Sequence, residues 1–366
     1  MVIPHCRLSG ATRIAGYLTS ALAELQGESE VVVISSDLNI MMFPDWFPEG
    51  CRHVSLAKHA GDLPRALREK LLVEFIRSLG ATQVFNVNSS LFWDAFKSFG
   101  KALSVTTDVY AYFFCNDKDE LGNWVGYPLE KFYRHFDMLS GVITDSHVLA
   151  DELRERYIVP DAQQHKLVTL ETPVPDVPPI APTPIRTTKD RPTFFWSGRF
   201  DRQKRVDIAF AIARAMPDCD FRFWGEPVLD GPGITANAPD NVSFEGTYSS
   251  LEELPFEECD AWLYTSEWDG VPNILIEIAA RAVPLVGSIA GGTGEILKPG
   301  MSWPVKDIED VDAYVSCLRD AATNVDEARA RAIRLRHEVL GRRTADIYRK
   351  TLKDFLSACR RIEETV

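Results

Sequence analysis

Short runs of apolar residues alternate along this chain with longer segments in which apolar residues recur every three or four positions. The longer segments, such as residues 11–25 and 63–80, have the spacing of amphipathic helices. Short runs typical of buried strands are found at residues 31–36, 84–89, 102–107, 141–146 and 167–170, after a very short first strand at Val2 and Ile3. Strands that alternate with helices predict a parallel sheet that is covered on both faces.

The pattern stops in a proline-dense segment, residues 173–192, and then starts again. Proline lacks a backbone donor, so this segment predicts an extended linker rather than a helix or a central strand. The strands expected after it are residues 192–198, 220–225, 241–246, 260–266 and 283–288. From about residue 311 the chain is expected to be helical to its end, with Leu352, Phe355 and Leu356 on one side of the last helix.

These elements predict two Rossmann-like α/β domains, residues 1–172 and residues 193–349, that face a central cleft. The last helix, about residues 350–366, is expected to pack back on the first domain. Because ligands of open α/β sheets bind beyond the carboxyl ends of the strands, candidate functional residues are sought in the loops that follow strands.

Composition excludes several classes of protein. The net charge of the 366 residues is -13, which argues against nucleic acid as the main partner. Seven cysteines without a metal-binding or paired spacing favour a reducing compartment over a disulfide framework. No signal peptide and no apolar run long enough for a membrane span is found, so a cytoplasmic protein is expected.

The loop after the first strand of the second domain concentrates positive charge. Gly198 ends the strand, and a helix is expected to open near Val206 after the cations Arg199, Arg202, Lys204 and Arg205. Cations at a helix N-terminus oppose the helix dipole, so a bound phosphate or diphosphate would satisfy both the cations and the free N–H groups. The alternative is a solvated basic loop that Asp201 and Asp207 offset in part.

A glycine-rich turn follows the strand at residues 283–288. It contains Gly291, Gly292 and Gly294 before Glu295. Glycines let a backbone approach a ligand closely and expose its N–H groups. The turn has neither the Walker nor the dinucleotide-binding pattern, and a purely structural turn remains the alternative.

A third candidate is the segment SEWDGVPNILIE, residues 266–277. Pro272 suits the first turn of a helix, on which Asn273, Glu277 and Arg281 share one face. Glu277 has two interpretations: a surface ion pair with Arg281, or an acceptor of hydrogen bonds from a pair of sugar hydroxyls. Asp269, in the preceding loop, would then lie nearer to the reacting centre.

Together these motifs resemble the donor domain of family 4 glycosyltransferases, which have the GT-B fold. The resemblance covers residues 194–297, with SGRFDRQKR, the SEWDGVPNILIE segment and IAGGTGEIL as its strongest parts. It extends more weakly to residues 8–18, LSGATRIAGYL, which look like the glycine-containing loop at the start of the family's first helix. It implies a retaining glycosyltransferase that depends on a nucleotide sugar.

The resemblance also implies roles for residues of the second domain. Arg199 and Lys204 match the pair that binds the diphosphate, and Asp269 and Glu277 match the family's two acidic residues. Glu277 would contact the ribose hydroxyls and Asp269 the transferred sugar. The donor-binding set also includes residues at strand and helix ends, some of which would act through nearby backbone N–H groups: Gly198, Gly270, Val271, Pro272, Asn273, Gly292, Glu295 and, from the first domain, Gly10.

Three departures from the family pattern stand out. Asp269 replaces a glutamate, which shortens the reach by one methylene, and Arg205 replaces a glycine, which would add a charge beside the phosphates. A His-Asp pair usual in the first domain reads Thr107-Asp108 here. The acceptor-side candidates are therefore Asn88, Asp108 and Tyr110.

The resemblance implies a nucleoside-diphosphate sugar as co-substrate, a saccharide or lipid-linked acceptor, and at most peripheral membrane contact. It implies no further cofactor and no metal. Synthesis of a glycan, polysaccharide or glycolipid is the expected setting, and the inner face of the membrane is a further expected location.

Three rival interpretations are kept open. A metal-dependent GT-A transferase would use an Asp-x-Asp triplet, of which the chain has two, at residues 117–119 and 218–220. A sugar phosphorylase or a sugar-nucleotide epimerase would use a similar fold. A catalytically silent GT-B scaffold would fit the replaced glutamate and the missing histidine.

Overall fold

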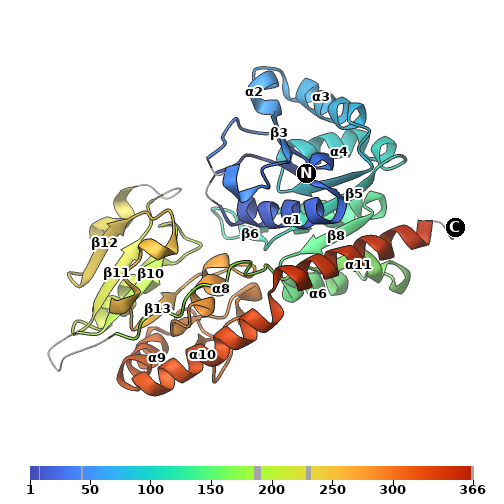
Figure 1. Ribbon diagram of the computed structural model, residues 1–366. Coiled ribbons are helices and arrows are strands. Elements are labelled where there is room, and N and C mark those ends of the chain that lie inside the picture. The colour runs from blue at the N-terminus through green and yellow to red at the C-terminus, as the bar shows by residue number, and fades with distance from the viewer. Residues whose placement is uncertain (8, 43, 185–190, 228–231, 364–366) are drawn as a thin grey trace. The chain divides into compact units, whose positions relative to one another are not determined.

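The computed structural model of the protein describes residues 1–366 except residues 8, 43, 185–190, 228–231 and 364–366. The chain forms two compact units (Figure 1). The first contains Met1–Pro173 together with Arg343–Val366, and the second contains Val174–Arg342. Each unit is a parallel sheet covered by helices, as the alternating pattern predicts.

The sheet of the first unit has seven strands in the order β3-β2-β1-β4-β5-β8-β9. All of its pairings are parallel. The order reverses between β1 and β4, which creates a topological switch point at their carboxyl ends. The strands are β1 (Val2–Ile3), β2 (Val32–Ser35), β3 (Arg52–Ser55), β4 (Gln83–Val87), β5 (Asp108–Phe113), β8 (Gly141–Thr144) and β9 (Leu167–Thr169).

Helices cover both faces of this sheet because successive strand residues point to opposite sides. On β5, Val109 and Ala111 join a core that includes Leu72 of α3 and Phe92 of α4. Tyr110 and Tyr112 join the opposite core, to which α1 and α11 contribute. The helices of this unit are α1 (Gly10–Gln26), α2 (Leu56–Ala60), α3 (Arg65–Ser78), α4 (Ser90–Leu103), α5 (Tyr127–His135), α6 (His147–Arg156) and α11 (Ala345–Glu363).

One predicted strand of this unit is wrong. Residues 102–107 form the end of α4 and a turn, and the strand is β5, which starts at Asp108. Leu103 is buried as the last residue of α4, whereas Val105 is 81% exposed, so this segment cannot be a central strand. The buried run is the following one, because all but the first residue of β5 are fully buried.

The sheet of the second unit has six parallel strands in the order β12-β11-β10-β13-β14-β15. The first five in chain order agree with the predicted strands, whereas β15 was not predicted because it has three residues and a central proline. The strands are β10 (Thr193–Ser197), β11 (Asp220–Trp224), β12 (Val242–Gly246), β13 (Ala261–Tyr264), β14 (Leu285–Ser288) and β15 (Trp303–Val305).

Two cores again lie on the two faces of the sheet. Ile208 of α7 and Leu318 of α9 belong to one core. Ile278 of α8 and Leu335 of α10 belong to the other. The helices are α7 (Val206–Ala215), α8 (Asn273–Ala280), α9 (Val311–Thr323) and α10 (Val325–Arg342), so the predicted helical tail is three helices including α11.

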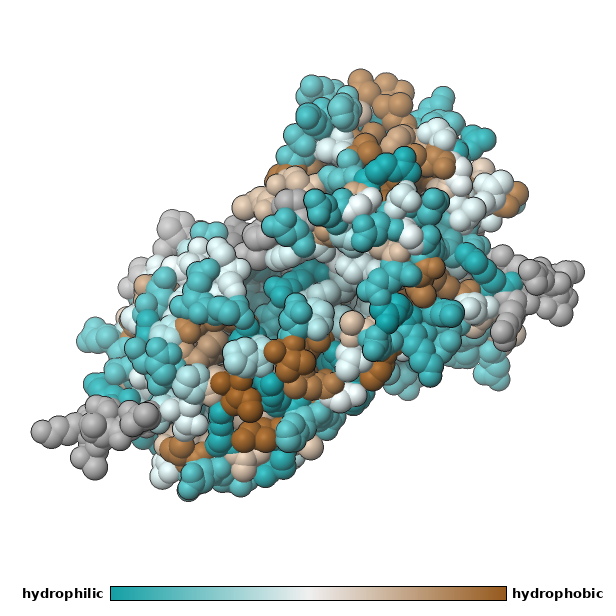
Figure 2. Space-filling view, viewed as in Figure 1, coloured by the Kyte–Doolittle hydropathy of each residue, from teal (hydrophilic) through white to brown (hydrophobic). Residues whose placement is uncertain are grey.

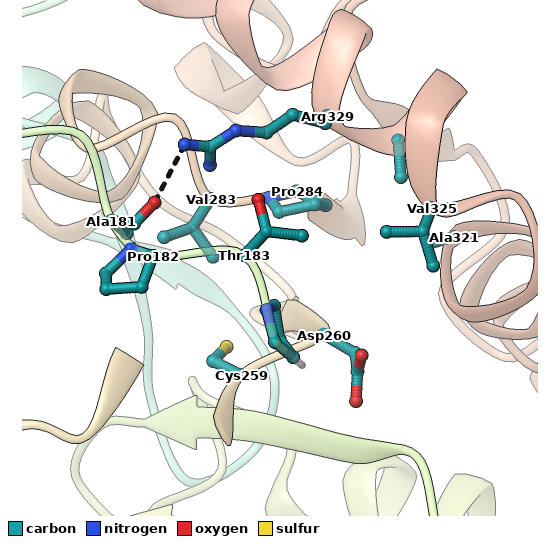
Figure 3. Close-up of a pocket in the computed structure, with 12 residues that line it drawn as sticks. Ala181, Pro182, Thr183, Cys259, Asp260, Val283, Pro284, Ala321, Val325 and Arg329 are labelled. Atoms are coloured by element: carbon teal, nitrogen blue, oxygen red, sulfur yellow. Dashed lines mark hydrogen bonds between the residues drawn. The ribbon is translucent and has the colours of Figure 1, made fainter. Parts of the chain in front are cut away.

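The proline-dense segment begins as part of the second unit. The backbone N–H of Ala181 donates to the Arg281 carbonyl oxygen over 2.8 Å. Nη2 of Arg329 donates to the Ala181 carbonyl oxygen, also over 2.8 Å, as Figure 3 shows. The second unit therefore starts at Val174 rather than at residue 193, and the later part of the segment, residues 185–190, lies outside the described residues.

The division near the C-terminus also differs from the expected boundary at residue 349. The second unit ends at Arg342, and α11 belongs to the first unit. Leu352, Phe355 and Leu356 of α11 are buried in the core that also holds α1. The amphipathic pattern of the last helix thus reflects a packed face in the first unit.

No helix in the described ranges is long and apolar enough to span a membrane. Figure 2 shows a mostly hydrophilic surface on the face in view, with hydrophobic residues in small separate groups. Scattered apolar residues of this kind are ordinary on a folded protein.

Candidate functional site

Three loops at the carboxyl edge of the second sheet contain most of the predicted donor-binding residues. They follow β10, β13 and β14, and β13 pairs with both of the other strands. Neighbouring parallel strands end at one edge of a sheet, so the three loops are brought together by the fold. The sequence predicted this convergence.

The loop after β10 is shaped by a buried aspartate. The Asp201 side chain is 1% exposed, and its Oδ1 accepts a 3.0 Å hydrogen bond from the backbone N–H of Lys204. Gly198 and Gly225 approach closely at the base of the loop, because a Cβ on Gly225 would lie 1.9 Å from the Gly198 carbonyl oxygen. Arg205 ends the loop in the left-handed region, with φ of 47°.

Carboxylates of the protein itself balance three of the cations in this loop. Arg199 Nε lies 3.2 Å from Asp201 Oδ2, and Arg199 also donates to Gln203 Oε1 over 2.6 Å. Arg205 pairs with the carboxylates of Asp207, Glu267 and Glu309. The expectation that the charges require a bound anion is therefore too strong, and the Arg205 guanidinium is held by these carboxylates rather than left available beside a phosphate.

Lys204 is the cation that enters the site itself. Its Nζ lies 2.6 Å from Oδ2 of Asp269, and both side chains are mostly buried. The Tyr264 hydroxyl donates to the same Oδ2 over 2.6 Å, and the backbone N–H of Gly270 donates to Oδ1 over 3.1 Å. Asp269 is thus fixed by an ammonium, a phenol and a backbone amide at the edge of the sheet.

Further hydrogen bonds join the loops after β10 and β13. Gln203 donates from Nε2 to the Trp268 carbonyl oxygen over 2.9 Å, and the Glu267 N–H donates to the Gln203 carbonyl oxygen over 2.8 Å. Thr265 donates from Oγ1 to the Lys204 carbonyl oxygen over 2.8 Å. The two loops therefore form one hydrogen-bonded unit around Lys204 and Asp269.

The glycine-rich turn after β14 packs against the backbone of Asp269. Gly291 has a φ of 57°, and a Cβ there would lie 2.1 Å from the Asp269 carbonyl oxygen. Gly292 donates from its N–H to that same oxygen over 3.2 Å. Gly291 and Gly292 therefore have a structural role, because they let the turn pack against the backbone of the Asp269 loop. Glu295, at the end of the turn, is half-buried.

Helix α8 begins next to this cluster without a side-chain cap. Pro272 occupies the N-cap position and no side chain accepts from the first turn. Both polar atoms of the Asn273 amide are buried and have no hydrogen-bond partner among the described residues. Buried polar atoms normally have partners, so this amide and the uncapped helix end suit a polar ligand. Val271, just before, is buried.

Glu277 lies one turn further along α8 and its side chain is half-buried. Arg281 pairs with Glu252 and donates to the backbone carbonyl of Glu277 over 3.2 Å. Arg281 therefore contacts the Glu252 carboxylate and the Glu277 backbone. Neither of these contacts is the predicted ion pair with the Glu277 carboxylate.

The first unit has a hollow of its own at the switch point of its sheet. A cavity of about 170 Å³ is lined by residues beyond β1 and β4 that include His5, Arg7, Ser9, Ala11, Thr12 and Asn88. Gly10 starts α1 between the lining residues, and Ser9 caps that helix by accepting from the Thr12 N–H over 3.2 Å. Asn88 is in the left-handed region, with φ of 66°.

His5 places an imidazole in the lining of this cavity. Burial, followed by the charge of Arg7, lowers the pKa of His5 below its usual value. Its Nδ1 is buried without a hydrogen-bond partner among the described residues. The sequence singled out Gly10 and Asn88 here and placed His5 at the end of the first strand, whereas the role of Arg7 as a lining residue needed the fold.

Two acceptor-side candidates are wrong on position. Asp108 is the first residue of β5, at the amino end of the strand, where Ser140 donates to it over 3.4 Å. Tyr110 is fully buried within β5 and stacks on Phe85 with ring centroids 4.7 Å apart. Both errors follow from the predicted strand at residues 102–107. Residues 108–110 were expected just beyond the carboxyl end of that strand, whereas they form the start of β5.

The Asp-x-Asp triplets have structural roles. Asp218 pairs with Arg319 over 2.8 Å, and this hydrogen-bonded pairing lowers the pKa of Asp218 to about 2. Asp220 pairs with Arg191 over 3.0 Å. Asp119 accepts from the backbone N–H groups of Leu121 and Asn123 in a turn. None of these contacts favours the GT-A interpretation.

A second, smaller hollow lies at the opposite edge of the second sheet (Figure 3). Its volume is about 20 Å³, room for about one water. Asp260 and Pro284, which line it, precede β13 and β14. Its size and its place at the amino ends of the strands exclude it as the substrate site of this fold.

Comparisons with known proteins agree with this geometry. Residues 191–324 match the family model described as glycosyl transferases group 1. These residues contain the loops after β10, β13 and β14 and all of α8. A comparison with curated protein sequences gives no match.

Three solved structures with the same architecture are distant in sequence. Sucrose-phosphate synthase from Thermosynechococcus elongatus has a TM-score of 0.74 and 16% identity, over 100% of this chain and 96% of that one. Anabaena HepE, in complex with UDP and glucose, has a TM-score of 0.70 and 12% identity, over 97% of this chain and 98% of that one.

TarM has a TM-score of 0.62 and 13% identity, over 80% of this chain. This chain spans only 58% of the length of TarM. Identities this low establish the fold and leave the activity to the site. The chain has the GT-B fold of these solved structures, and its residues 191–324 are similar to group 1 glycosyltransferases.

Proposed function

We propose that this protein is a retaining glycosyltransferase that moves a sugar from a nucleoside-diphosphate sugar to an acceptor hydroxyl. The observation that carries the proposal is the buried pair of Lys204 and Asp269, whose Nζ and Oδ2 atoms are 2.6 Å apart. It lies among three loops at the carboxyl edge of a parallel sheet, beside an uncapped helix end. The structure of HepE with UDP and glucose, on the same fold, supports this class of donor.

The diphosphate is the group that the second unit is best suited to bind. Arg199 is 46% exposed, so its guanidinium can exchange Asp201 and Gln203 for a phosphate oxygen. Lys204 can turn from Asp269 to the diphosphate, since one ammonium has three donors. Gly198, Gly292 and the backbone from Gly270 to Asn273 would complete the donor site.

The sugar and the ribose would lie on either side of the diphosphate. In this proposal Asp269 orients hydroxyls of the transferred sugar, and Glu277 accepts hydrogen bonds from the ribose. Glu295 would contact the donor beside Gly292. The Asn273 amide, buried and without a described partner, would pair with the donor.

The chemical barrier is the departure of the diphosphate as positive charge grows on the sugar carbon. Arg199, Lys204 and helix N-termini would stabilise the negative charge on the leaving group before the reaction starts. In this proposal these groups supply the charge that a metal supplies elsewhere, so no metal and no other cofactor is required. The donor's own phosphate accepts the proton of the incoming hydroxyl.

The acceptor would bind to the first unit, where Asn88 lines the cavity of about 170 Å³. A saccharide or lipid-linked acceptor, and a cytoplasmic enzyme with at most peripheral membrane contact, complete the proposal. Its setting would be glycan, polysaccharide or glycolipid synthesis.

A panel of UDP, GDP, ADP and inorganic phosphate tests the donor class by thermal shift. We expect one nucleoside diphosphate to stabilise the protein by mass action, and the shift to be lost in Arg199→Ala and in Lys204→Ala. Arg205→Gly is the matched control, because it removes a neighbouring cation that carboxylates already hold. Glycine also accepts the left-handed conformation at that position.

Transfer to a mixed panel of saccharide acceptors then tests the reaction. Normal nucleotide binding and turnover in both Arg199→Ala and Lys204→Ala would sink the diphosphate assignment. A response to inorganic phosphate alone would replace the proposal by a sugar phosphorylase. Nucleotide binding without transfer or donor hydrolysis would favour the silent scaffold.

A further inference from the structure

A small hairpin at the carboxyl edge of the first sheet holds an exposed tryptophan. The hairpin consists of β6 (Asp117–Lys118) and β7 (Trp124–Val125), which pair antiparallel with Lys118 opposite Trp124. It follows β5, whose neighbour in the sheet is β4, and β4 ends at Val87, just before the cavity residue Asn88. The hairpin is therefore on the ligand-binding edge of the first unit.

Trp124 differs from every other tryptophan in the chain. All eight are among the described residues, and six of them are at most 5% exposed. Trp46 is half-buried, whereas Trp124 is 53% exposed. An aromatic side chain exposed at the ligand edge of an α/β fold is placed where it can contact a ligand.

The hairpin presents this indole in a fixed orientation. Asp119 closes the turn by accepting from the N–H groups of Leu121 and Asn123 over 2.9 and 2.8 Å. The Lys118 ammonium lies 4.9 Å from the centroid of the Trp124 ring and so covers one part of it. A cation over an aromatic ring holds the ring in place without burying its other surface.

The two ends of the hairpin segment are anchored in the core through one residue. Phe113, at the end of β5, stacks on Trp93 with ring centroids 5.6 Å apart. Tyr127, at the start of α5, lies against the same Trp93 with centroids 6.1 Å apart. Because Trp93 is buried, both ends of the segment are fixed and the hairpin is pre-organised.

We propose that Trp124 is a binding platform for a neutral saccharide acceptor, whose ring stacks on the open part of the indole. This inference rests on the proposed function, and it names the class of acceptor that the first unit takes. The same hairpin carries carboxylate and amide groups at Asp117, Asp119 and Asn123, which can accept or donate hydrogen bonds to sugar hydroxyls.

The charge of the hairpin favours a neutral acceptor over an anionic lipid surface. Residues 117–125 contain three carboxylates and one ammonium. A surface of that sign repels anionic headgroups, whereas polar hydroxyl groups are not repelled. The exposed Leu121 at the tip is the residue that a membrane contact would use instead, and it supplies the control.

The test uses the full chain with maltotetraose and cellotetraose as probes, measured by calorimetric titration. We expect at least one of them to bind, Trp124→Ala to weaken binding about tenfold, and Trp124→Phe to weaken it only a few-fold because a ring remains. Leu121→Ala is expected to bind like the wild type. Iodide should quench the exposed Trp124 fluorescence, and the bound saccharide should protect it.

Three outcomes would overturn the inference: no binding of either probe, equal binding by the wild type and Trp124→Ala, or saccharide-independent binding to phosphatidylglycerol vesicles that Leu121→Ala and Trp124→Ala abolish. The nucleotide-induced thermal shift separates this inference from the proposed function, because Trp124→Ala should leave it unchanged. If neither saccharide binds the wild type and the nucleotide shift is intact, only the platform inference is contradicted. Absence of any nucleotide shift with Trp124-dependent saccharide binding contradicts the donor assignment alone.

Discussion

Lys204 Nζ lies 2.6 Å from Asp269 Oδ2, although the two residues follow different strands and are 65 positions apart in the chain. The pair neutralises two mostly buried charges. In the proposed reaction, a diphosphate would offer Lys204 a second anionic partner, while Asp269 would stay held by the Tyr264 hydroxyl and the Gly270 N–H. The pair can therefore change from a structural contact to a catalytic arrangement without a change of fold.

Asp269→Asn tests whether this carboxylate acts in the reaction. The change leaves Lys204 without its anionic partner, so we expect the free energy of unfolding to fall by about 1–3 kcal/mol. We expect transfer to fall about 100-fold, because a charged contact to the sugar is lost. Chemical denaturation and steady-state kinetics measure the two effects.

Tyr264→Phe is the matched control for that variant. It removes one hydrogen bond to Asp269 Oδ2 and leaves the ion pair with Lys204 in place. We expect a smaller loss of turnover than in Asp269→Asn. Full turnover in Asp269→Asn would remove Asp269 from the chemistry and return the pair to a structural role.

Glu277→Gln tests the proposed ribose contact. The amide keeps the size of the side chain and removes its charge, so we expect the donor KM to rise about tenfold and the kcat to change little. Steady-state kinetics at varied donor concentration gives both constants. Glu277→Ala should raise the KM at least as much, and an unchanged KM in both variants would leave Glu277 as a surface residue of α8.

Gly291→Ala tests the contact between the glycine-rich turn and the Asp269 loop. A Cβ at this left-handed position would lie 2.1 Å from the Asp269 carbonyl oxygen, so the turn and the loop must move apart. We expect a loss of about 1–3 kcal/mol in the free energy of unfolding together with a large loss of transfer. Thermal or chemical denaturation measures the first effect.

Two other glycines serve as controls that separate the effect of the steric clash from the effect of backbone strain. At Gly294, in the same turn, an added Cβ would have its nearest neighbour 3.6 Å away, so Gly294→Ala should leave stability and transfer nearly unchanged. Gly300 has φ of 78° and a Cβ there would meet no atom within 4 Å, so Gly300→Ala should show backbone strain without loss of transfer. Equal activity in Gly291→Ala and Gly294→Ala would contradict the role of the turn.

The stability of the first unit should depend on pH through His135. This buried ring stacks on Trp93 with centroids 5.7 Å apart, and burial, followed by the charges of Lys131 and Arg134, lowers the pKa of His135 below 6.5. The unfolded chain therefore binds more protons than the folded one near that pH. The free energy of unfolding should fall as the pH drops through about 6.5 toward the lowered value.

Chemical denaturation at about pH 7.5 and about pH 5.5 measures this effect. In His135→Phe and His135→Leu the difference between the two pH values should be smaller than in the wild type, whatever the absolute stability of each variant. Substitution of the exposed His59 by Gln should keep the full difference. An unchanged difference in both His135 variants would assign the acid sensitivity elsewhere.

Much of the candidate donor site could be predicted from local sequence. Strand ends that carry Gly198, the proline at 272 and the glycines near 291 are recognisable because turn and helix-start chemistry depends on a few neighbouring residues. The same locality explains the error at residues 102–107. Apolar residues at the end of α4 and those of β5 are contiguous in the chain, and only packing separates them.

Contacts between residues that are far apart in the chain could not be predicted in this way. Arg205 was expected to face a phosphate, yet Asp207, Glu267 and Glu309 hold it, and two of these come from other loops. Trp124 had no sequence signal that distinguished it from the seven other tryptophans. Its exposure depends on the hairpin, whose turn Asp119 closes. The end of the hairpin segment is held by a contact between Tyr127 and Trp93 of α4.

The sequence by itself determined the alternation of strands and helices, the two Rossmann-like sheets and the positions of the charged and glycine-rich loops, because periodicity and turn chemistry are local properties. Only the tertiary structure decided where the units divide, which carboxylate meets each cation, and that Asp108 and Tyr110 lie away from the ligand edge. These depend on strand order and register, which bring together residues that are far apart in the chain.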